Sequence, residues 1–250
     1  MLSIVVTLFS GCAQQEAQTS GSSSEAESST HSAVLTESSQ LGASSEVSLE
    51  NRKLNVSIVQ MPILDTAESL DYLRTAVDIL MEEEVLRPEL VVGVEYGLGF
   101  IPQRTDSEFI EYLGAIAKKH HIYFIPGTFM ELSDDLPEGE TYNTCPVFGP
   151  DDQLIEVYRK KAPYYPVEAS APSTSPDYCI FDIEEKGFTV GVQICYDQFF
   201  PEISRTLALE GAELIVCPFY DPAEFDYIPD AIPRCRALEN ELFYIWTNGV

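Results

Sequence analysis

The chain has 250 residues and a formal net charge of −27, with 45% hydrophobic and 11% aromatic residues. The apolar fraction is ordinary for a globular protein with a sizeable core, and the length fits one large domain or two small ones. The acidic charge argues against sequence-independent nucleic-acid binding, which needs a basic surface, and against docking on anionic lipid by electrostatics alone. We therefore expect no nucleic-acid partner.

The first twelve residues, 1–12, combine a short apolar run with a cysteine. The run LSIVVTLF is followed by Ser10, Gly11 and Cys12. Small residues before a cysteine at the end of such a run resemble a bacterial lipoprotein signal, in which Cys12 would carry the lipid. The run is too short to span a bilayer. The alternative interpretation is a buried N-terminal strand.

Residues 13–53 form a polar segment that is rich in Ser and Glu. This composition cannot bury enough apolar surface to offset the entropy of ordering, so we expect a disordered tether. Behind a lipid on Cys12, a flexible tether predicts an extracytoplasmic domain anchored to a membrane. The alternative is a plain disordered tail without an anchor.

Residues 54–250 alternate between strand and helix patterns, with adjacent strands in the middle. Runs of β-branched residues predict strands, and apolar residues at helical spacing predict helices. In chain order we expect a strand at 54–60, a helix at 67–86, a strand at 89–95, a helix at 107–121, strands at 122–130, 141–149 and 154–160, a hairpin at 178–195, a helix at 201–212, a strand at 213–219, a helix at 231–242 and a strand at 243–250. This order predicts a layered α/β domain. Because the sequence stops directly after an apolar strand, we expect the C-terminal part of the domain to be missing.

The six cysteines and three histidines show no zinc spacing and no C-x-x-C motif. The sequence also has no G-x-S-x-G elbow, P-loop, G-x-G-x-x-G fingerprint or H-E-x-x-H motif. His120 and His121 close a predicted helix, where a solvated helix end is their simplest role. A nucleophilic cysteine would therefore need a carboxylate as its base.

Four polar residues lie at or just after the ends of predicted strands. Glu95 ends one strand, Lys160 a second and Cys195 a third, while Glu168 follows a proline-containing loop. Ligand sites in open α/β sheets gather at the carboxyl ends of strands, so these side chains are candidates for one pocket. For each residue alone, an ordinary strand end remains an equal alternative.

Three separated motifs resemble the nitrilase (carbon–nitrogen hydrolase) superfamily: VVGVEYG with Glu95, YRKKAPYYPVE with Lys160, and GVQICYDQFFPE with Cys195. The resemblance spans about residues 54–250 and is closest to the aliphatic amidase and formamidase branch, in which the second glutamate, here Glu168, belongs to the site. It implies a four-layer α-β-β-α sandwich, a homodimer or larger assembly, and no metal or organic cofactor. Register favours Lys160 over its neighbour Lys161 as the lysine of the site.

The resemblance implies hydrolysis of a small amide through a thioester on Cys195. Glu95 would accept the thiol proton, and Lys160 would stabilise the oxyanion together with the backbone N–H of Tyr196. Glu168 would orient the substrate nitrogen or the hydrolytic water. A carboxylate with an ordinary pKa is a weak base for a thiol, so we expect burial to raise the pKa of Glu95.

Tyrosines near these residues are candidates for the pocket wall, and ordinary packing is an equal alternative for each. They are Tyr96, Tyr164 and Tyr165. Two other functions stay open: an acyltransferase that passes the acyl group to an amine, and a binding lipoprotein without activity. The sequence does not separate short amides from nitriles or carbamoyl compounds.

Overall fold

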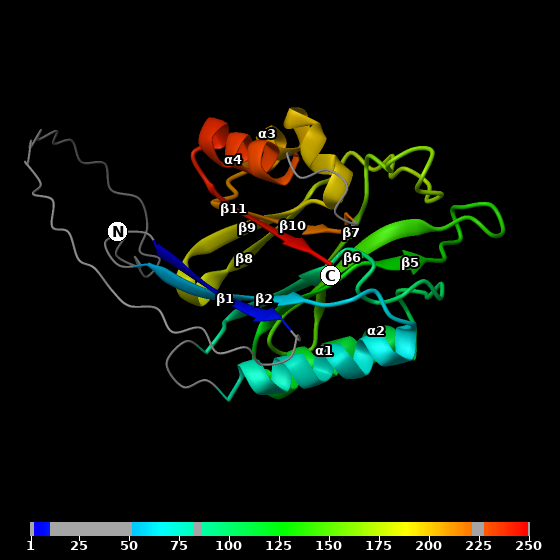
Figure 1. The fold of residues 1–250 in the computed structure, drawn as a ribbon, viewed down its shortest axis with the longest axis horizontal. Coiled ribbons are helices and arrows are strands. Elements are labelled where there is room, and N and C mark those ends of the chain that lie inside the picture. The colour runs from blue at the N-terminus through cyan, green and yellow to red at the C-terminus, as the bar shows by residue number, and fades with distance from the viewer. Residues whose placement is uncertain (1–2, 11–51, 83–86, 222–227, 250) are drawn as a thin grey trace, which may run out of the picture.

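The computed structural model describes residues 3–10, 52–82, 87–221 and 228–249. Two β-sheets lie face to face, and a pair of helices covers the outer face of each sheet (Figure 1). The strands are β1 (Ser3–Ser10), β2 (Lys53–Gln60), β3 (Leu90–Val94), β4 (Tyr123–Gly127), β5 (Phe129–Glu131), β6 (Tyr142–Phe148), β7 (Leu154–Arg159), β8 (Cys179–Ile183), β9 (Phe188–Val192), β10 (Leu214–Phe219) and β11 (Phe243–Asn248). The α-helices are α1 (Thr66–Leu80), α2 (Glu108–His120), α3 (Pro201–Leu209) and α4 (Ile228–Asn240), and two short 3₁₀ helices are η2 (Glu184–Lys186) and η3 (Cys195–Phe199).

The larger sheet has the strand order β1-β2-β3-β4-β6-β5, with β7 paired to β6. Strands β1 to β4 are parallel, whereas β6 runs antiparallel to β4, β5 and β7. Every residue of β3 is buried, as expected for a parallel strand that is covered on both faces. The carboxyl end of β3 is the point from which Glu95 projects.

The smaller sheet has the order β11-β10-β9-β8. Strands β9, β10 and β11 are parallel, and β8 and β9 form the expected antiparallel hairpin. The hairpin turns through η2 and Gly187, whose φ of 64° lies in the left-handed region that glycine adopts without strain. Cys195 follows the carboxyl end of β9 by three residues.

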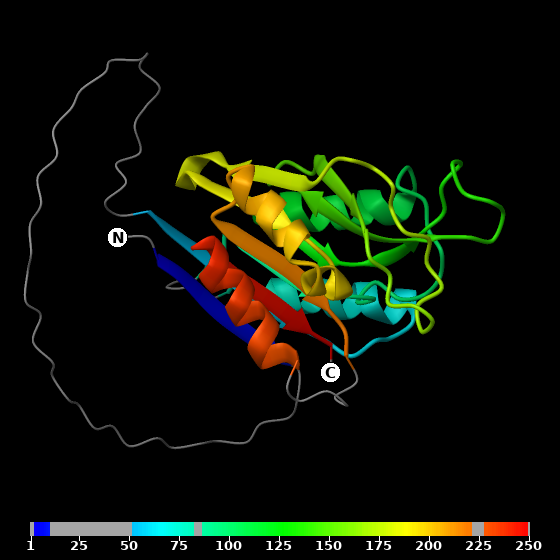
Figure 2. The ribbon, with the colours of Figure 1, turned by 90° about the horizontal axis from the view of Figure 1, so that it is seen from above.

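The core is divided into two main layers. One cluster of buried side chains, with members such as Val92, Val190 and Val216, lies between the sheets. A second cluster, with Leu73 and Leu113, lies between the larger sheet and helices α1 and α2. Helices α3 and α4 cover the outer face of the smaller sheet (Figures 1 and 2). The predicted four-layer α-β-β-α architecture is therefore confirmed.

The predicted strand over 122–130 is interrupted, and its two parts become β4 and β5. Gly127 has a φ of 109°, and a Cβ on this residue would lie 2.2 Å from the carbonyl oxygen of Val94. The chain therefore bends where it approaches the end of β3 most closely. The bend also places Thr128 next to the residues that follow β3, since Thr128 N donates to Val94 O at 3.2 Å.

The N-terminal segment differs from the signal interpretation. Ser3–Ser10 forms β1, which pairs in parallel with β2 from Ser3 opposite Lys53 to Ser10 opposite Gln60 (Figure 2). This is the strand that the sequence left as the alternative. Cys12 and residues 13–51 of the predicted tether lie outside the described residues. None of the helices described is long and apolar enough to cross a bilayer.

Candidate active site

The two sheets bring the four predicted polar residues together in the interior. Glu95 and Lys160 follow β3 and β7 of the larger sheet, and Cys195 follows β9 of the smaller one. Glu95 and Lys160 are each 1% exposed, and Glu168 and Cys195 are also buried. Because buried charges are stable only when they are paired and hydrogen-bonded, the partners of these groups define the site.

The Glu95 carboxylate is hydrogen-bonded on both oxygens. Lys160 Nζ donates to Oε1 at 2.7 Å, and Asn143 Nδ2 donates to the same oxygen at 2.9 Å. The backbone N–H of Tyr220 donates to Oε2 at 3.1 Å. Glu95 also hydrogen-bonds the Cys195 side chain. The carboxylate therefore lies between the lysine and the thiol.

Lys160 lies between two carboxylates. Its Nζ donates to Glu95 and, at 2.6 Å, to Glu168 Oε2. Glu168 is further held by Ser170 Oγ at 2.6 Å and by Asn143 Nδ2 at 2.9 Å, both on Oε1. An ammonium has three N–H donors, so one remains for a substrate oxygen.

Lys161 is directed elsewhere, so Lys160 is the lysine that faces Glu95. Lys161 Nζ donates to the carbonyl of Ser175 at 2.7 Å and lies 4.4 Å from the centre of the Tyr178 ring. Strand β7 ends at Arg159, and the backbone N–H of Lys160 still donates to Asn143 O at 2.9 Å. This hydrogen bond holds the backbone of Lys160 beside β6. The structure therefore places Lys160, which the sequence favoured over Lys161, next to Glu95.

The pKa values of the two glutamates move in opposite directions. Burial raises the pKa of the Glu95 carboxyl above its ordinary value, although the Lys160 charge opposes this shift. Burial also acts to raise the pKa of Glu168, but the Lys160 charge and the hydrogen bonds from Lys160, Ser170 and Asn143 outweigh it and lower the pKa to about 2. Two carboxyls with separated pKa values suit different roles, with Glu95 as the proton acceptor and Glu168 as a fixed anion.

The Cys195 thiol stays protonated at rest. Burial raises its pKa well above the ordinary value, and the negative charge of Glu95 adds to the shift, whereas Lys160 opposes it. The thiolate is the nucleophilic form, so the proton must be taken up during attack. Burial of Lys160 favours its neutral form, but the charges of Glu95, Cys195 and Glu168 outweigh that effect and raise its pKa well above the ordinary value. The lysine is therefore the fixed cation of the site.

The nucleophile lies on a tight turn. Cys195 has a φ of 44°, in the left-handed region that non-glycine residues seldom adopt. It begins the short helix η3 directly after the extended Ile194. A side chain on such a turn is held away from the strand and toward the neighbouring sheet.

The family profile described as carbon–nitrogen hydrolase matches residues 55–250, from within β2 onward. The chain belongs to the carbon–nitrogen hydrolase family. A hydrolase from Pseudomonas protegens, named for its place in the 5′ region of pqqF, is 30% identical over 205 residues, which cover 79% of this chain and 70% of that protein. Omega-amidase NIT2-B from Xenopus laevis is 30% identical over 214 residues, covering 76% of this chain and 72% of the relative.

Solved structures of hydrolases share the fold. An amidase from Nesterenkonia sp. superposes with a TM-score of 0.67 and 22% identity, covering 82% of this chain and 80% of the amidase. Nit3 from Saccharomyces cerevisiae, a member of branch 10 of the nitrilase superfamily, gives a TM-score of 0.66 at 23% identity, covering 79% of this chain and 74% of Nit3. The expected superfamily and fold are thereby confirmed, and the chain is an enzyme of the amidase type.

Aromatic side chains of this hydrolase surround the nucleophile turn. The Tyr196 ring lies 4.8 Å from Tyr164, 4.7 Å from Phe199 and 5.6 Å from Phe200, measured between ring centroids. Tyr164 therefore contacts the nucleophile turn, as expected for a wall residue. Tyr165 is 68% exposed, and its place in the wall stays a prediction, as does the oxyanion contact of the Tyr196 N–H.

Tyr96 lies beside the catalytic group. It has a φ of 57°, and its backbone N–H donates to Thr128 Oγ1 at 2.8 Å. Its phenol hydrogen-bonds Glu168, and burial together with the charges of Glu95 and Glu168 raises its pKa. The Tyr96 ring contacts Phe100, with 5.2 Å between centroids. Tyr96 thus lies between the Glu168 carboxylate and Phe100, an exposed residue.

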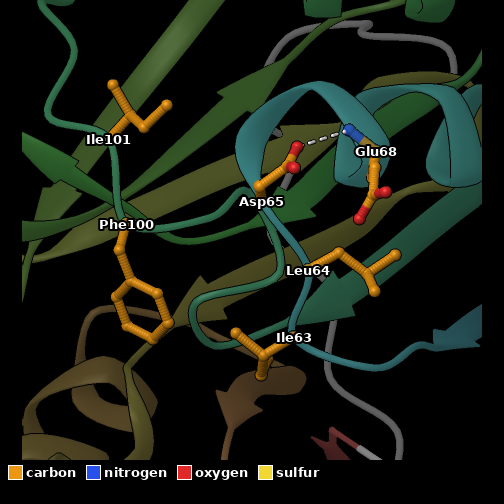
Figure 3. A pocket seen from close by; sticks show the side chains of 6 residues that line it. All are labelled: Ile63, Leu64, Asp65, Glu68, Phe100 and Ile101. Atoms are coloured by element: carbon orange, nitrogen blue, oxygen red, sulfur yellow. Dashed lines mark hydrogen bonds between the residues drawn. The ribbon is translucent and has the colours of Figure 1, made fainter.

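Phe100 also lines a surface pocket of about 520 Å³ (Figure 3). Its lining is apolar apart from two carboxylates and consists of Ile63, Leu64, Asp65, Glu68, Phe100 and Ile101. Asp65 caps α1, since its carboxylate accepts from Glu68 N at 3.0 Å. Of the lining residues, Phe100 contacts Tyr96. Ile63 lies close to Gly249, since a Cβ on Gly249 would be 3.4 Å from Ile63. The same Cβ would be 2.7 Å from Tyr220, whose backbone N–H donates to Glu95.

Sequence reasoning missed Asn143, which donates to both glutamates of the hydrolase. Asn143 is fully buried in β6, and every residue of that strand is buried. A polar amide inside a run of buried strand residues is a signal that could have been found, because such a group needs a buried partner. Ser170 gave no comparable signal, since it lies in a loop with many other serines and prolines.

Proposed function

We propose that Cys195 is the nucleophile of an amide-hydrolysing enzyme and that the reaction passes through a thioester. The observation that carries the proposal is the buried Glu95–Lys160–Glu168 array around the thiol. The amidase from Nesterenkonia sp. AN1, one of the structural neighbours, bears covalent adducts at its active-site cysteine and binds butyramide. These neighbours support the same chemistry in this chain.

In the first half of the reaction, the Cys195 thiol gives its proton to Glu95, and the sulfur forms a bond to the amide carbon. The carbonyl oxygen becomes an oxyanion, which accepts the remaining N–H of Lys160. Glu95 then returns the proton to the amide nitrogen as the carbon–nitrogen bond breaks and ammonia leaves. The raised pKa of Glu95 suits a group that both accepts and returns a proton.

In the second half, water attacks the thioester carbon while Glu95 accepts a water proton. The carbon–sulfur bond then breaks, the proton passes to Cys195, and the carboxylic acid leaves. Glu168 remains ionised throughout, because its pKa is about 2. As a fixed anion it orients the NH₂ group of the substrate and, after ammonia has left, the incoming water.

The test measures ammonia release and the mass of the protein. The substrates are acetamide, butyramide, butyronitrile and an N-carbamoyl amino acid. We expect release with amides, an acyl adduct on Cys195, and a loss of about 10³-fold or more in Cys195→Ala. Cys235→Ala is the matched control, since Cys235 is an exposed free cysteine on α4. Equal release by wild type and Cys195→Ala would overturn the assignment, and preferential acyl transfer to added hydroxylamine would favour the transferase alternative.

For the substrate class, we propose amides without a carboxylate. We propose that the substrate passes the surface pocket lined by Phe100, which contacts Tyr96; this pocket also contains Asp65 and Glu68, and none of its lining residues is Lys or Arg. Lys160 already binds two carboxylates. An anionic substrate would therefore meet like charges, which raises the free energy of binding.

The monoamide of succinic acid matches butyramide in length and adds a carboxylate, so this pair tests the charge preference. We expect kcat/KM to be about tenfold or more higher for butyramide. Glu68→Gln removes one negative charge of the pocket and should lower the ratio of kcat/KM for butyramide to kcat/KM for the monoamide. A preference for the acid, or a ratio that Glu68→Gln leaves unchanged, argues against this substrate class.

We also propose that the enzyme is an extracytoplasmic lipoprotein anchored through Cys12. The support is the apolar run before Ser10-Gly11-Cys12 and the Ser/Glu-rich segment after it. Cleavage before Cys12 would remove β1, so signal processing and the β1–β2 pairing exclude one another in the mature protein. Fatty-acid labelling and the mass of the mature N-terminus decide between them: lipid on Cys12 supports the anchor, and a retained Met1 excludes it.

For assembly, we propose a homo-oligomer that uses the face formed by α3 and α4. Leu209 and Leu238 on these helices are 78% and 81% exposed. Exposed large apolar side chains on two helices that contact each other suit a protein contact. Light scattering should give a dimer or larger mass, and Leu209→Glu combined with Leu238→Glu should give a monomer. A monomeric wild type contradicts the proposal.

A further inference from the structure

Asp197 is a further buried carboxylate group, and the mechanism above does not use it. It lies in η3, two residues after Cys195, and is fully buried. Its Oδ2 accepts from Tyr158 Oη at 2.8 Å and from Ile194 N at 3.0 Å, and its Oδ1 accepts from Ala162 N at 2.8 Å. Three donors from two separate segments therefore converge on one side chain.

The three donors flank the catalytic residues in the chain. Tyr158 and Ala162 lie two residues before and two residues after Lys160, and Ile194 directly precedes Cys195. Tyr158 belongs to the larger sheet, whereas Ile194 follows β9 of the smaller sheet. Asp197 thus joins the lysine segment of one sheet to the nucleophile turn of the other.

The chemistry of the contacts favours an ionised carboxylate. Each oxygen of Asp197 faces a backbone N–H, which can only donate, and Tyr158 donates as well; an ionised carboxylate is a side chain that only accepts. An amide would turn its NH₂ group toward one of the donors, and a protonated carboxyl would bring a donor of its own. A side chain needed only for packing would not have to be an acceptor on both oxygens.

The hydrogen bonds of Asp197 can hold the strained turn at Cys195 in place. Cys195 holds a φ of 44°, and such a conformation persists when the surrounding contacts fix it. Asp197 bonds to the residue before the turn through both its side chain and its backbone, since Asp197 N also donates to Ile194 O at 2.9 Å. The remaining hydrogen bonds of the carboxylate, from Tyr158 and Ala162, fix the segment that carries Lys160.

We propose that ionised Asp197 is a positioning residue that sets the placement of the Cys195 thiol relative to Lys160. The inference rests on the proposed roles of Cys195 and Lys160. It predicts that loss of the Asp197 charge slows the reaction of the thiol without removing any group that touches the substrate.

The same contacts make the enzyme sensitive to acid. Burial raises the pKa of Asp197 to about 6, against the Ile194 N–H, the Lys160 charge, the Tyr158 hydroxyl and the Ala162 N–H. Other titratable groups that interact with Asp197 from the elements around it are Lys161, Cys217 and Tyr244. As the pH falls through about 6, the carboxylate gains a proton and one of its donors loses its acceptor.

The experiment follows the rate at which iodoacetamide alkylates Cys195, read by mass spectrometry between pH 5 and pH 8, together with kcat and KM for butyramide. Asp197→Asn should lower the alkylation rate and kcat by about 10- to 100-fold and change KM by less than about threefold. Asp182→Asn is the matched control, because Asp182 is an exposed residue of β8 that accepts from Thr189 Oγ1 at 2.7 Å.

Tyr158→Phe keeps the carboxylate and removes one donor, so the pKa of Asp197 rises. The acid midpoint of Cys195 alkylation should therefore move up by about 0.5–1 pH unit. Tyr123→Phe, in β4, removes a hydroxyl that bonds Glu185 and should leave the midpoint in place. If Asp197→Asn does not fold, the acid midpoint of Cys195 alkylation in Tyr158→Phe still tests the proposal.

Two results would overturn the inference: a Tyr158→Phe midpoint equal to that of the wild type, or a folded Asp197→Asn variant with wild-type rates. Alkylation reports on Cys195 itself and not on any one substrate. A wild type that releases no ammonia therefore removes the proposed hydrolysis, while the two alkylation results still test the positioning role.

Discussion

Lys160 Nζ lies 2.7 Å from Glu95 Oε1, and both side chains are almost fully buried. The two residues are 65 positions apart and come from β7 and β3, which do not pair with each other in the larger sheet. A buried ion pair of this kind stabilises a fold little by itself, because the desolvation of both charges offsets their attraction. The arrangement is better explained by the chemistry, in which Glu95 exchanges a proton and Lys160 holds an oxyanion.

The first prediction concerns the two adjacent lysines. Lys160→Met removes the cation that faces the thiol, and the loss of one oxyanion donor typically lowers kcat by about 10²- to 10³-fold. Lys161→Met is the matched variant, since Lys161 bonds the Ser175 carbonyl instead. It should retain kcat within about threefold. Ammonia release from butyramide checks both variants.

Lys160→Met also leaves Glu95 and Glu168 without their cation, so its fold must be checked by circular dichroism. Lys160→Arg keeps the charge but replaces a compact ammonium by a planar group with a different reach. It should fold and still lose most activity. Equal loss in Lys161→Met and Lys160→Met would show that the wrong lysine has been placed in the reaction.

The second prediction concerns Asn143, which donates to both Glu95 and Glu168. Asn143→Ala removes a donor that stabilises their ionised forms, so the pKa of both carboxyls rises. The acid side of the kcat/KM profile should then move to higher pH, because Glu95 loses its base form earlier. Asn143→Asp should move it further, since a third carboxylate is added.

The pH profile of kcat/KM for butyramide measures this shift. Asn55→Ala is the control, because Asn55 Nδ2 bonds the Arg87 carbonyl at 3.2 Å, at the edge of β2 and outside the site. An unchanged acid midpoint in a folded Asn143→Ala would mean that Glu95 does not govern the acid side.

The third prediction concerns stability and the low pKa of Glu168, about 2 against an ordinary value of 4.5. A carboxyl whose pKa is depressed by folding contributes stability above its unfolded pKa and loses it as the pH falls toward the folded pKa. A shift of this size corresponds to about 3 kcal/mol. Glu168→Gln should therefore be less stable than the wild type at pH 7, and the difference should shrink as the pH falls below 4.5.

Urea unfolding at several pH values from 7 down to 3.5 measures the difference, with Glu138→Gln, at an exposed loop position, as the control. A difference between wild type and Glu168→Gln that stays constant with pH would show that Glu168 contributes by packing and not by its charge.

The sequence predicted the layers of this fold well, because most of its elements have a clear period. The strand LVVGV is buried on both faces, and β8 and β9 form the hairpin predicted over 178–195. The predicted strand over 122–130 was less accurate. Its break at Thr128 results from the approach of Gly127 to Val94, a contact between distant segments that no local pattern contains.

The candidate site was predictable where strand ends carried unusual residues, as Glu95, Lys160 and Cys195 do. Partners that reach the site from the middle of another strand were not predicted, and Asn143 is the main example. Asp197 was not predicted either. Its three donors come from residues up to 39 positions away, so its role depends on how the two sheets pack.

The last prediction tests the close approach of β3 and β4. A Cβ on Gly127 would lie 2.2 Å from Val94 O, and the residue has a φ of 109°. Gly127→Ala therefore adds both backbone strain and a steric clash beside Glu95. We expect it to lower the free energy of unfolding by about 3 kcal/mol and to reduce kcat, because the clash displaces the segment that carries the base.

Gly211→Ala separates the two effects. Gly211 has a nearly equal φ of 106°, but a Cβ there would have no neighbour within 4 Å. Backbone strain alone should make this variant about 1 kcal/mol less stable and leave kcat unchanged. Urea unfolding and butyramide turnover compare the two variants. Equal destabilisation of Gly127→Ala and Gly211→Ala would mean that the positive φ of Gly127, and not its close approach to Val94, is the reason for glycine at this position.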